Sequence, residues 1–431
     1  MGIRLFAVGS AALLASVTTG CALSHERGGG DARVSFVDSE PPPRDGGPRP
    51  PDGGPPPVDA FLRRDAWSPT FTVAPHGPLP IVTDQGGRRM HHPQLVVITY
   101  ADDVDRAAHE GLTRWAATSD WLATVGGEYG IDGATLLGVV ERTDRAPSSI
   151  TDEQIAATIR NGIANGTMPV PAGGVLDDAL YILHFPPGTT ITDDLVGRSC
   201  ETFGGYHNES QTADGRLFAY AVVPSCPSAF PDLSDLANEQ VATTHEIFEA
   251  ATDPLPFTAP GWAFGTTLAD YSPWLFAGAE LADLCEYRLG PAAYYREGGF
   301  TVTRIWSNAA ARRGDVDPCV PWDGAPYGTV TPAPGTVQFA APGSTVTFDL
   351  AAWSTASMPS FQIGAFASSQ GAGTFMADVL LDRSSVVNGD HATLTVTVPF
   401  GAQSQDYGLV YILVNDVNGN VDYVPVVVVA N

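Results

Sequence analysis

Residues 231–254 have the pattern of one long helix, and this segment constrains the fold more than any other part of the chain. An acidic or hydroxyl side chain among residues 232–235 can cap its start. Asp253 precedes Pro254 and ends it, because a residue before proline disfavours the α conformation. Side chains at spacings of three and four form its apolar face: Leu233, Leu236, Ala237, Val241, Thr244, Ile247, Phe248 and Ala251.

The predicted helix carries the sequence His245-Glu246-Ile-Phe-Glu249. Residues four apart lie about 40° apart around a helix, so His245 and Glu249 can reach one ion from the same side. The pattern is similar to H-E-x-x-H of metallopeptidases, in which the glutamate after the first ligand activates a metal-bound water. We therefore predict His245 and Glu249 as metal ligands and Glu246 as the catalytic base.

Zinc is the first candidate for this divalent metal, because zinc accepts both imidazole nitrogen and carboxylate oxygen. The negative charge of Glu249 makes a bound ion a weaker Lewis acid, so another divalent metal is a second candidate. The alternative to a metal site is a structural hydrogen bond between His245 and Glu249 across one turn. For comparison, His109-Glu110 has Thr113 at the corresponding fourth position, and we interpret that pair as ordinary helix surface.

A metal bound by this helix needs at least one further protein ligand, and the acidic segment 278–286 is the candidate source. Glu280 and Asp283 lie three residues apart and can share a helical face. The alternative for each of them is a solvated acidic turn. Upstream, His207 follows a glycine-rich turn, and we predict that it binds substrate or polarises a carbonyl; the alternative is a structural histidine.

The first 68 residues have the features of an export signal and a tether. Residues 1–20 contain a basic residue and a short apolar run, which is a secretory signal rather than a membrane span. The residues before Cys21 resemble a bacterial lipobox, so we predict lipidation at Cys21; Ala22 then favours the outer membrane, and secretion without a lipid is the alternative. Residues 21–68, rich in proline and glycine, are predicted to be an extended tether.

The composition favours export and excludes nucleic acid as a partner. All 22 basic residues are arginine, and 48 acidic residues give a net charge of −26. Such a surface repels nucleic acid and anionic membranes, so a membrane contact is expected only through the N-terminal lipid.

Apart from the candidate lipidation site, the chain has four cysteines, an even number that fits two disulfides in an exported protein. Sequence order favours pairing Cys200 with Cys226 and Cys285 with Cys319. Three connectivities are open on sequence alone.

In the rest of the chain, the pattern of predicted helices and strands changes near residue 325, which indicates two domains. Strand patterns at 93–100, 178–185 and 217–223 and helix patterns at 106–129 and 151–160 precede the 231–254 helix, an order typical of an α/β metallopeptidase-like domain. Residues 326–431 have the pattern of short strands and no helix pattern, which predicts an immunoglobulin-like β-sandwich.

Six segments in order resemble uncharacterised secreted bacterial proteins, which are distantly similar to the phosphate-induced, exordium-like proteins of plants. The segments are 181–191, 205–207, 220–224, 244–254, 280–285 and 306–308. The resemblance implies an extracellular zincin-like domain in which His245 and Glu249 bind metal, Glu246 is the base, and Glu280 or Asp283 completes the site. The predicted fold class is thus an α/β (α+β) zincin-like domain at 69–325 followed by an all-β sandwich.

From these observations we expect a secreted or surface-anchored metal-dependent hydrolase. A peptidase that acts on a peptide or protein substrate through a metal-bound water is the first candidate. The alternative is a non-enzymatic cell-surface protein with a structural or degenerate metal site, which the absence of a second histidine in the motif favours.

Overall fold

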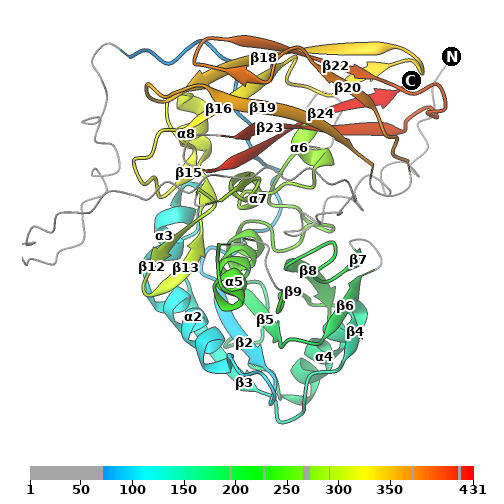
Figure 1. Ribbon diagram of the computed structural model, residues 1–431. Coiled ribbons are helices and arrows are strands. Elements are labelled where there is room, and N and C mark those ends of the chain that lie inside the picture. Colours follow the sequence, from blue (N-terminus) through cyan, green and yellow to red (C-terminus); the bar gives the residue numbers. More distant parts are fainter. Residues whose placement is uncertain are drawn as a thin grey trace, which may run out of the picture.

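The computed structural model describes residues 71–193, 197–226, 230, 232–265, 272–290, 292–369, 373–415 and 419–431. The predicted signal peptide, the lipidation site Cys21 and the tether lie outside the described residues. The chain is mixed α/β, with many strands and few helices. Figure 1 shows two units: a lower one in which helices flank a sheet, and an upper one built mostly of strands.

A five-stranded sheet forms the centre of the lower unit, in the order β3-β2-β5-β9-β8. The first four strands are parallel, and β8 pairs antiparallel with β9 at the edge. Strands β2 and β5 are buried almost throughout, which explains their continuous apolar sequences. The strands are β2 (Gln94–Thr99), β3 (Thr135–Glu141), β5 (Ala179–Phe185), β8 (Tyr206–Gln211) and β9 (Leu217–Pro224).

Helices cover both faces of this sheet. Alternate residues of a strand point to opposite faces, so Leu180 and Ile182 of β5 pack with Phe248 of α5, whereas Leu183 packs with Ile159 of α4. The helices are α2 (Arg106–Thr118), α3 (Trp121–Gly126), α4 (Asp152–Asn165) and α5 (Asp235–Thr252). The single helix expected at 106–129 is two helices, because the chain is extended at Ser119, and a 3-10 turn follows at Gly127–Tyr129.

Helix α5 confirms the predicted helix within residues 231–254. The hydroxyl of Ser234 accepts a hydrogen bond from the Ala237 backbone and caps the start, and Asp253 follows the last residue. Every residue from 237 to 252 is buried. The expectation of one apolar face was therefore incomplete, because the polar face of α5 is also covered by protein.

Two sheets that pack face to face form the upper unit. Their orders are β16-β18-β22-β20 and β11-β24-β23-β19-β21, with β17 paired to β24. The core between them contains Phe348 and Leu394 of the first sheet and Phe361, Val410 and Val426 of the second. The strands are β16 (Gly328–Ala333), β17 (Gln338–Ala340), β18 (Thr345–Ser354), β19 (Phe361–Ser368), β20 (Asp378–Leu381), β21 (Ser385–Val386), β22 (His391–Thr397), β23 (Tyr407–Asn415) and β24 (Val421–Ala430).

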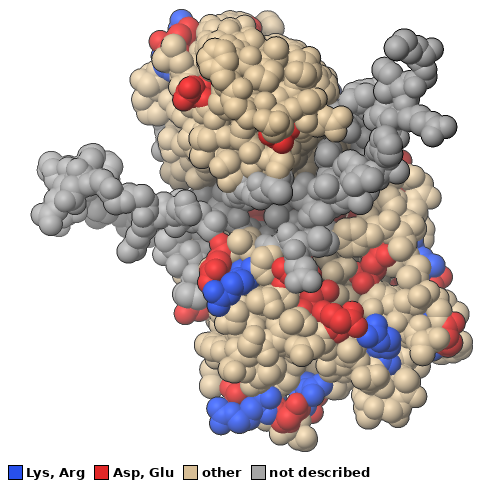
Figure 2. Space-filling view, turned by 90° about the vertical axis from the view of Figure 1, so that its right-hand side faces the viewer, with Lys and Arg blue, Asp and Glu red and all other residues tan. Residues whose placement is uncertain are grey.

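Short elements connect the two units and complete the lower one. The remaining strands are β1 (Thr83–Asp84), β4 (Ser149–Thr151), β6 (Thr190–Asp193), β7 (Gly197–Arg198), β10 (Trp262–Ala263), β11 (Arg288–Leu289), β12 (Tyr294–Glu297), β13 (Phe300–Thr303), β14 (Ile305–Trp306) and β15 (Cys319–Val320). The remaining helices are α6 (Pro273–Phe276), α7 (Asp283–Glu286) and α8 (Asn308–Arg313). Figure 2 shows that one side of the molecule exposes most of its charged side chains on the lower unit.

The two units share a sheet, although the sequence pattern changes near residue 325. Strand β11 pairs with β24, and the Tyr423 backbone donates a hydrogen bond to the Tyr287 carbonyl. The rings of Tyr287 and Tyr411 stack with centroids 5.9 Å apart. The segment that carries α7 is therefore attached directly to the C-terminal strands.

Both disulfides favoured by sequence order are present in the structure, Cys200–Cys226 and Cys285–Cys319. Disulfides of this kind fit an extracellular location. Within the described part of the chain, no helix has the length and apolar character needed to cross a membrane.

Replacing Arg288 by Ala is expected to lower the free energy of unfolding by about 3–5 kcal/mol. The buried guanidinium pairs with the carboxylates of Asp317 and Asp422, at 2.5 and 3.2 Å, and its loss leaves both buried charges without this partner. Urea denaturation measures the change. The control is Arg313→Ala, because Arg313 is half exposed and lies 3.8 Å from Asp315, where a pair contributes about 0–1 kcal/mol. Equal losses in the two variants would contradict the prediction.

Candidate metal centre

Three elements bring acidic and histidine side chains together in the lower unit. Helix α5 supplies His245, Glu246 and Glu249, β8 supplies His207, and α7 with the turn before it supplies a further set of carboxylates. These are Glu280, Asp283 and Glu286. All of these side chains are less than a tenth exposed. Segments far apart in the sequence thus form one buried polar cluster beside α5.

The Nε2 atom of His245 faces two carboxylate oxygens. It lies 3.0 Å from Glu249 Oε2 and 3.3 Å from Asp283 Oδ1. Ligands bound to zinc at about 2.0–2.1 Å in a tetrahedron are about 3.3 Å apart. The three side chains therefore have the spacing of ligands around one zinc-sized ion, and their ligand atoms all lie within 4.8 Å of one another.

Backbone hydrogen bonds hold both carboxylates in this orientation. Glu249 Oε1 accepts hydrogen bonds from the backbone N–H groups of Ala282 and Asp283, at 3.1 and 3.2 Å. Asp283 Oδ2 accepts one from the Glu280 backbone at 2.9 Å. Each carboxylate is thus fixed through one oxygen, and its other oxygen is directed at His245.

The other ring nitrogen of His245 faces a carboxylate that sequence reasoning assigned no role. His245 Nδ1 lies 3.1 Å from Glu286 Oε1, and burial raises the pKa of Glu286 to about 8. Metal-binding histidines commonly donate their second N–H to a carboxylate, which orients the ring and fixes its tautomer. Glu286 belongs to the same acidic segment as Asp283 and lies three residues later. This helical spacing could have predicted that the two side chains lie on the same side.

Glu246 lies beside these ligands, and its carboxylate has only a long contact with a histidine. Both of its oxygens are completely buried, and the nearest charged partner is His207 Nδ1, 3.4 Å from Oε2. Burial raises the pKa of the Glu246 carboxyl. Gly205 makes room for it, because a Cβ atom at that position would lie 2.9 Å from Glu246 Oε1. A buried carboxylate with open acceptor positions is suited to take up a proton.

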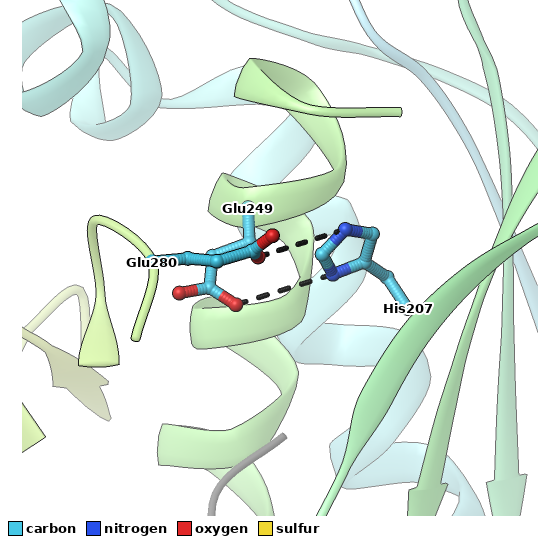
Figure 3. A group of neighbouring side chains, drawn as sticks. All are labelled: His207, Glu249 and Glu280. Atoms are coloured by element: carbon cyan, nitrogen blue, oxygen red, sulfur yellow. Dashed lines mark ion pairs between the residues drawn. The ribbon is translucent and has the colours of Figure 1, made fainter. Parts of the chain in front are cut away.

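Figure 3 shows that the two ring nitrogens of His207 face the carboxylates of Glu249 and Glu280. Its Nδ1 atom is 3.9 Å from Glu249 Oε2, and its Nε2 atom is 3.7 Å from Glu280 Oε2. Nε2 also lies 3.1 Å from the Asp253 carbonyl oxygen. Of the two carboxylates predicted as the further ligand, Asp283 therefore groups with His245, and Glu280 groups with His207.

The pKa values in the cluster are set by burial and by the other members. Burial lowers the pKa of His245, but Glu249 and Asp283 outweigh this effect and raise it well above its ordinary value. Burial and the Glu249 charge raise the pKa of Asp283 to about 6, and the same causes raise that of Glu280 strongly. The raised pKa values show that these carboxyl groups disfavour being charged together in the absence of a cation, and a bound cation would relieve this repulsion.

The interpretation of His109 as ordinary helix surface is wrong. His109 is buried, with Nδ1 3.0 Å from Asp103 Oδ2 and Nε2 2.7 Å from Glu239 Oε2, and its ring stacks on His184 at 4.2 Å. Burial lowers its pKa, but the two carboxylates raise it to about 9. Helix α2 packs against β2 and β3 of the sheet and against α5, so this face is covered, which a local pattern does not reveal.

Comparison with known proteins gives no family assignment. No protein-family model matches the chain, and no curated protein matches it. A nucleoside hydrolase-related hypothetical protein from Saccharophagus degradans aligns over 72% of this chain and 75% of its own, with 11% identity and a TM-score of 0.24. The C. elegans MSP family member WR4 aligns over 24% of this chain and 97% of its own, at 12% identity and a TM-score of 0.18. The periplasmic chaperone SfaE aligns over 25% and 57%, at 10% identity and a TM-score of 0.17.

Proposed function

We propose that this protein is an exported, metal-dependent hydrolase. The observation that carries the proposal is the arrangement of His245, Glu249 and Asp283, whose ligand atoms have the spacing of a tetrahedral site. Backbone hydrogen bonds orient the carboxylates, and Glu286 lies behind the imidazole. Three protein ligands leave a fourth position open, as in catalytic zinc sites.

The residues present suit zinc or a similar divalent ion. Such an ion supplies Lewis acidity, which lowers the pKa of water and polarises a carbonyl group. Glu246 then accepts the proton from the attacking water, for which its unoccupied carboxylate oxygens are available. His207 lies next to Glu246 and positions it, and is the candidate to polarise the substrate carbonyl.

A peptide or protein is the proposed substrate class. It is supported by the H-E-x-x-E sequence on α5, which places a base directly after the first ligand as in H-E-x-x-H peptidases. We further propose that the lower unit is a zincin-like domain related to the exordium-like proteins, and that the upper unit is an immunoglobulin-like sandwich. Lipidation at Cys21, or secretion without it, would place the protein outside the cytoplasm.

A second candidate function is a non-enzymatic surface protein with a structural metal site. Two observations favour it: the i+4 position of the motif is Glu249 instead of a histidine, and the ligand side chains are less than a tenth exposed. A structural site is closed by protein, whereas a catalytic site keeps a position for water.

Metal analysis combined with a peptide-library assay tests the proposed function. We expect the purified mature protein to contain zinc or another divalent ion and to cleave peptides. Removal of the ion with a chelator should abolish cleavage, and zinc should restore it. A protein that contains metal but cleaves no peptide or ester would support the structural alternative, and a protein without affinity for divalent ions would contradict both.

A further inference from the structure

The buried cluster contains two groups of candidate ligands that share one carboxylate. His245, Glu249 and Asp283 form the first group, and His207, Glu249 and Glu280 form the second. Within each group the ligand atoms lie within 4.8 Å of one another, and no such group among the described residues contains both histidines. An ion with bonds of about 2.0–2.4 Å cannot join ligand atoms that lie farther apart than about 4.8 Å. One ion therefore does not account for the whole cluster.

We propose that the site binds a second divalent cation between His207, Glu280 and Glu249, with Glu249 bridging the two ions. The proposal rests on the proposed function, because it adds an ion to the one assigned to His245. It makes His207 a metal ligand in place of a group that polarises the substrate carbonyl, and keeps its contact with Glu246.

The two histidines have similar surroundings. His245 has Glu286 at Nδ1, at 3.1 Å, and directs Nε2 at carboxylate ligands. His207 has Glu246 at Nδ1, at 3.4 Å, and directs Nε2 toward Glu280. A carboxylate on one nitrogen and candidate ligands on the other is the usual environment of a metal-binding histidine. The second histidine thus repeats the arrangement of the first in part, because its contact with Glu249 is made by Nδ1, at 3.9 Å, whereas that of His245 is made by Nε2.

The charge of the cluster supports a second cation. Among the described residues, the ion pairs of its five carboxylates are made only with His207 and His245. Five carboxyl groups share the site with two imidazoles, so the acidic groups outnumber the charges that one divalent ion supplies. Buried charge without compensation is strongly unfavourable.

A further observation is the buried carboxylate of Glu246 beside His207. This side chain is fully buried, and its closest polar partner is His207, whose Nδ1 atom lies 3.4 Å from Oε2. In the metal-bound form, an Nδ1–H of His207 directed at Glu246 would leave Nε2 with its lone pair, so Nε2 would exchange its hydrogen bond to the Asp253 carbonyl for a bond to the ion.

Oxygen atoms dominate the second group. Besides Glu280 and Glu249, the Asp253 carbonyl oxygen lies 3.1 Å from His207 Nε2, with which it forms a hydrogen bond. Carboxylate and carbonyl oxygens with a single imidazole suit Mn²⁺ better than a soft metal. Paired ions in hydrolases stabilise both the attacking and the leaving oxygen, so this centre fits a two-ion hydrolase.

Metal stoichiometry tests the proposal on the full mature chain. Chelator-treated protein is reloaded with Zn²⁺ or Mn²⁺, dialysed and analysed for metal per chain. We expect two ions in the wild type and one in Glu280→Gln and in His207→Asn. The control, Glu153→Gln, removes an exposed carboxylate of α4 and should retain two. Circular dichroism verifies that each variant is folded.

Electron paramagnetic resonance of the Mn²⁺-loaded wild type gives an independent readout. Two ions bridged by Glu249 should show exchange coupling, which Glu280→Gln should abolish. One ion in both the wild type and Glu280→Gln, without coupling, would overturn the second site and leave the proposed function intact. No ion in the wild type would overturn the proposed function as well.

Discussion

Replacing Glu249 by Ala is expected to remove all specifically bound metal from the chain. Glu249 belongs to both ligand groups, and its Oε2 atom lies 3.0 Å from His245 Nε2. The loss of a residue that only orients a ligand commonly lowers metal affinity by about 10–100-fold, so the loss of a ligand should lower it further. Metal analysis after dialysis and calorimetric titration with Zn²⁺ measure the effect.

Glu239→Ala is the matched control for this variant. Glu239 is also a buried carboxylate of α5, but it pairs with His109 and Ser225 and is in neither ligand group. Its replacement should lower stability without changing metal content. If Glu249→Ala retained the full metal content of the wild type, the assignment of both groups would be wrong.

The helix at the centre of the site could be predicted because its signals are local. The cap at Ser234, the stop at Asp253 and the three- and four-residue spacings all act within one segment, and α5 spans Asp235–Thr252 as expected. The spacing of His245 and Glu249 also follows from helix geometry alone. These features do not depend on how the rest of the chain folds.

The assignment of the other residues required the three-dimensional structure. Glu280 and Asp283 are equivalent in sequence, but the turn before α7 directs Asp283 toward His245 and Glu280 toward His207. The role of Glu286 at His245 Nδ1 depends on the docking of α7 against α5. Such contacts arise from tertiary packing, which spacing along the chain does not specify.

The position of α7 depends on the C-terminal unit. Cys285, between Asp283 and Glu286, is joined to Cys319, and the following residues enter β11, which pairs with β24. The positions of Asp283 and Glu286 at the candidate metal centre therefore depend on contacts with the C-terminal unit. The sequence boundary near residue 325 separates two patterns, but it does not separate two independent structures.

Glu246→Gln is expected to lower the rate of hydrolysis by about 10²–10⁴-fold, the usual contribution of general-base catalysis. The amide has the size of the carboxylate but cannot accept the proton of the attacking water. Glu246 is in neither ligand group, so the metal content should remain that of the wild type. Initial rates with the best substrate from the peptide library, together with metal analysis, measure both quantities.

The buried environment makes this comparison informative. The closest polar contact of the Glu246 carboxylate is His207 Nδ1 at 3.4 Å, which an amide oxygen can also accept, so the fold should tolerate the amide. A decrease in kcat at unchanged metal content therefore reports a step of the reaction instead of a loss of structure. Turnover by Glu246→Gln at the wild-type rate would exclude Glu246 as the base. His207, whose Nδ1 atom lies 3.4 Å from the same carboxylate, would then be the next candidate for the base.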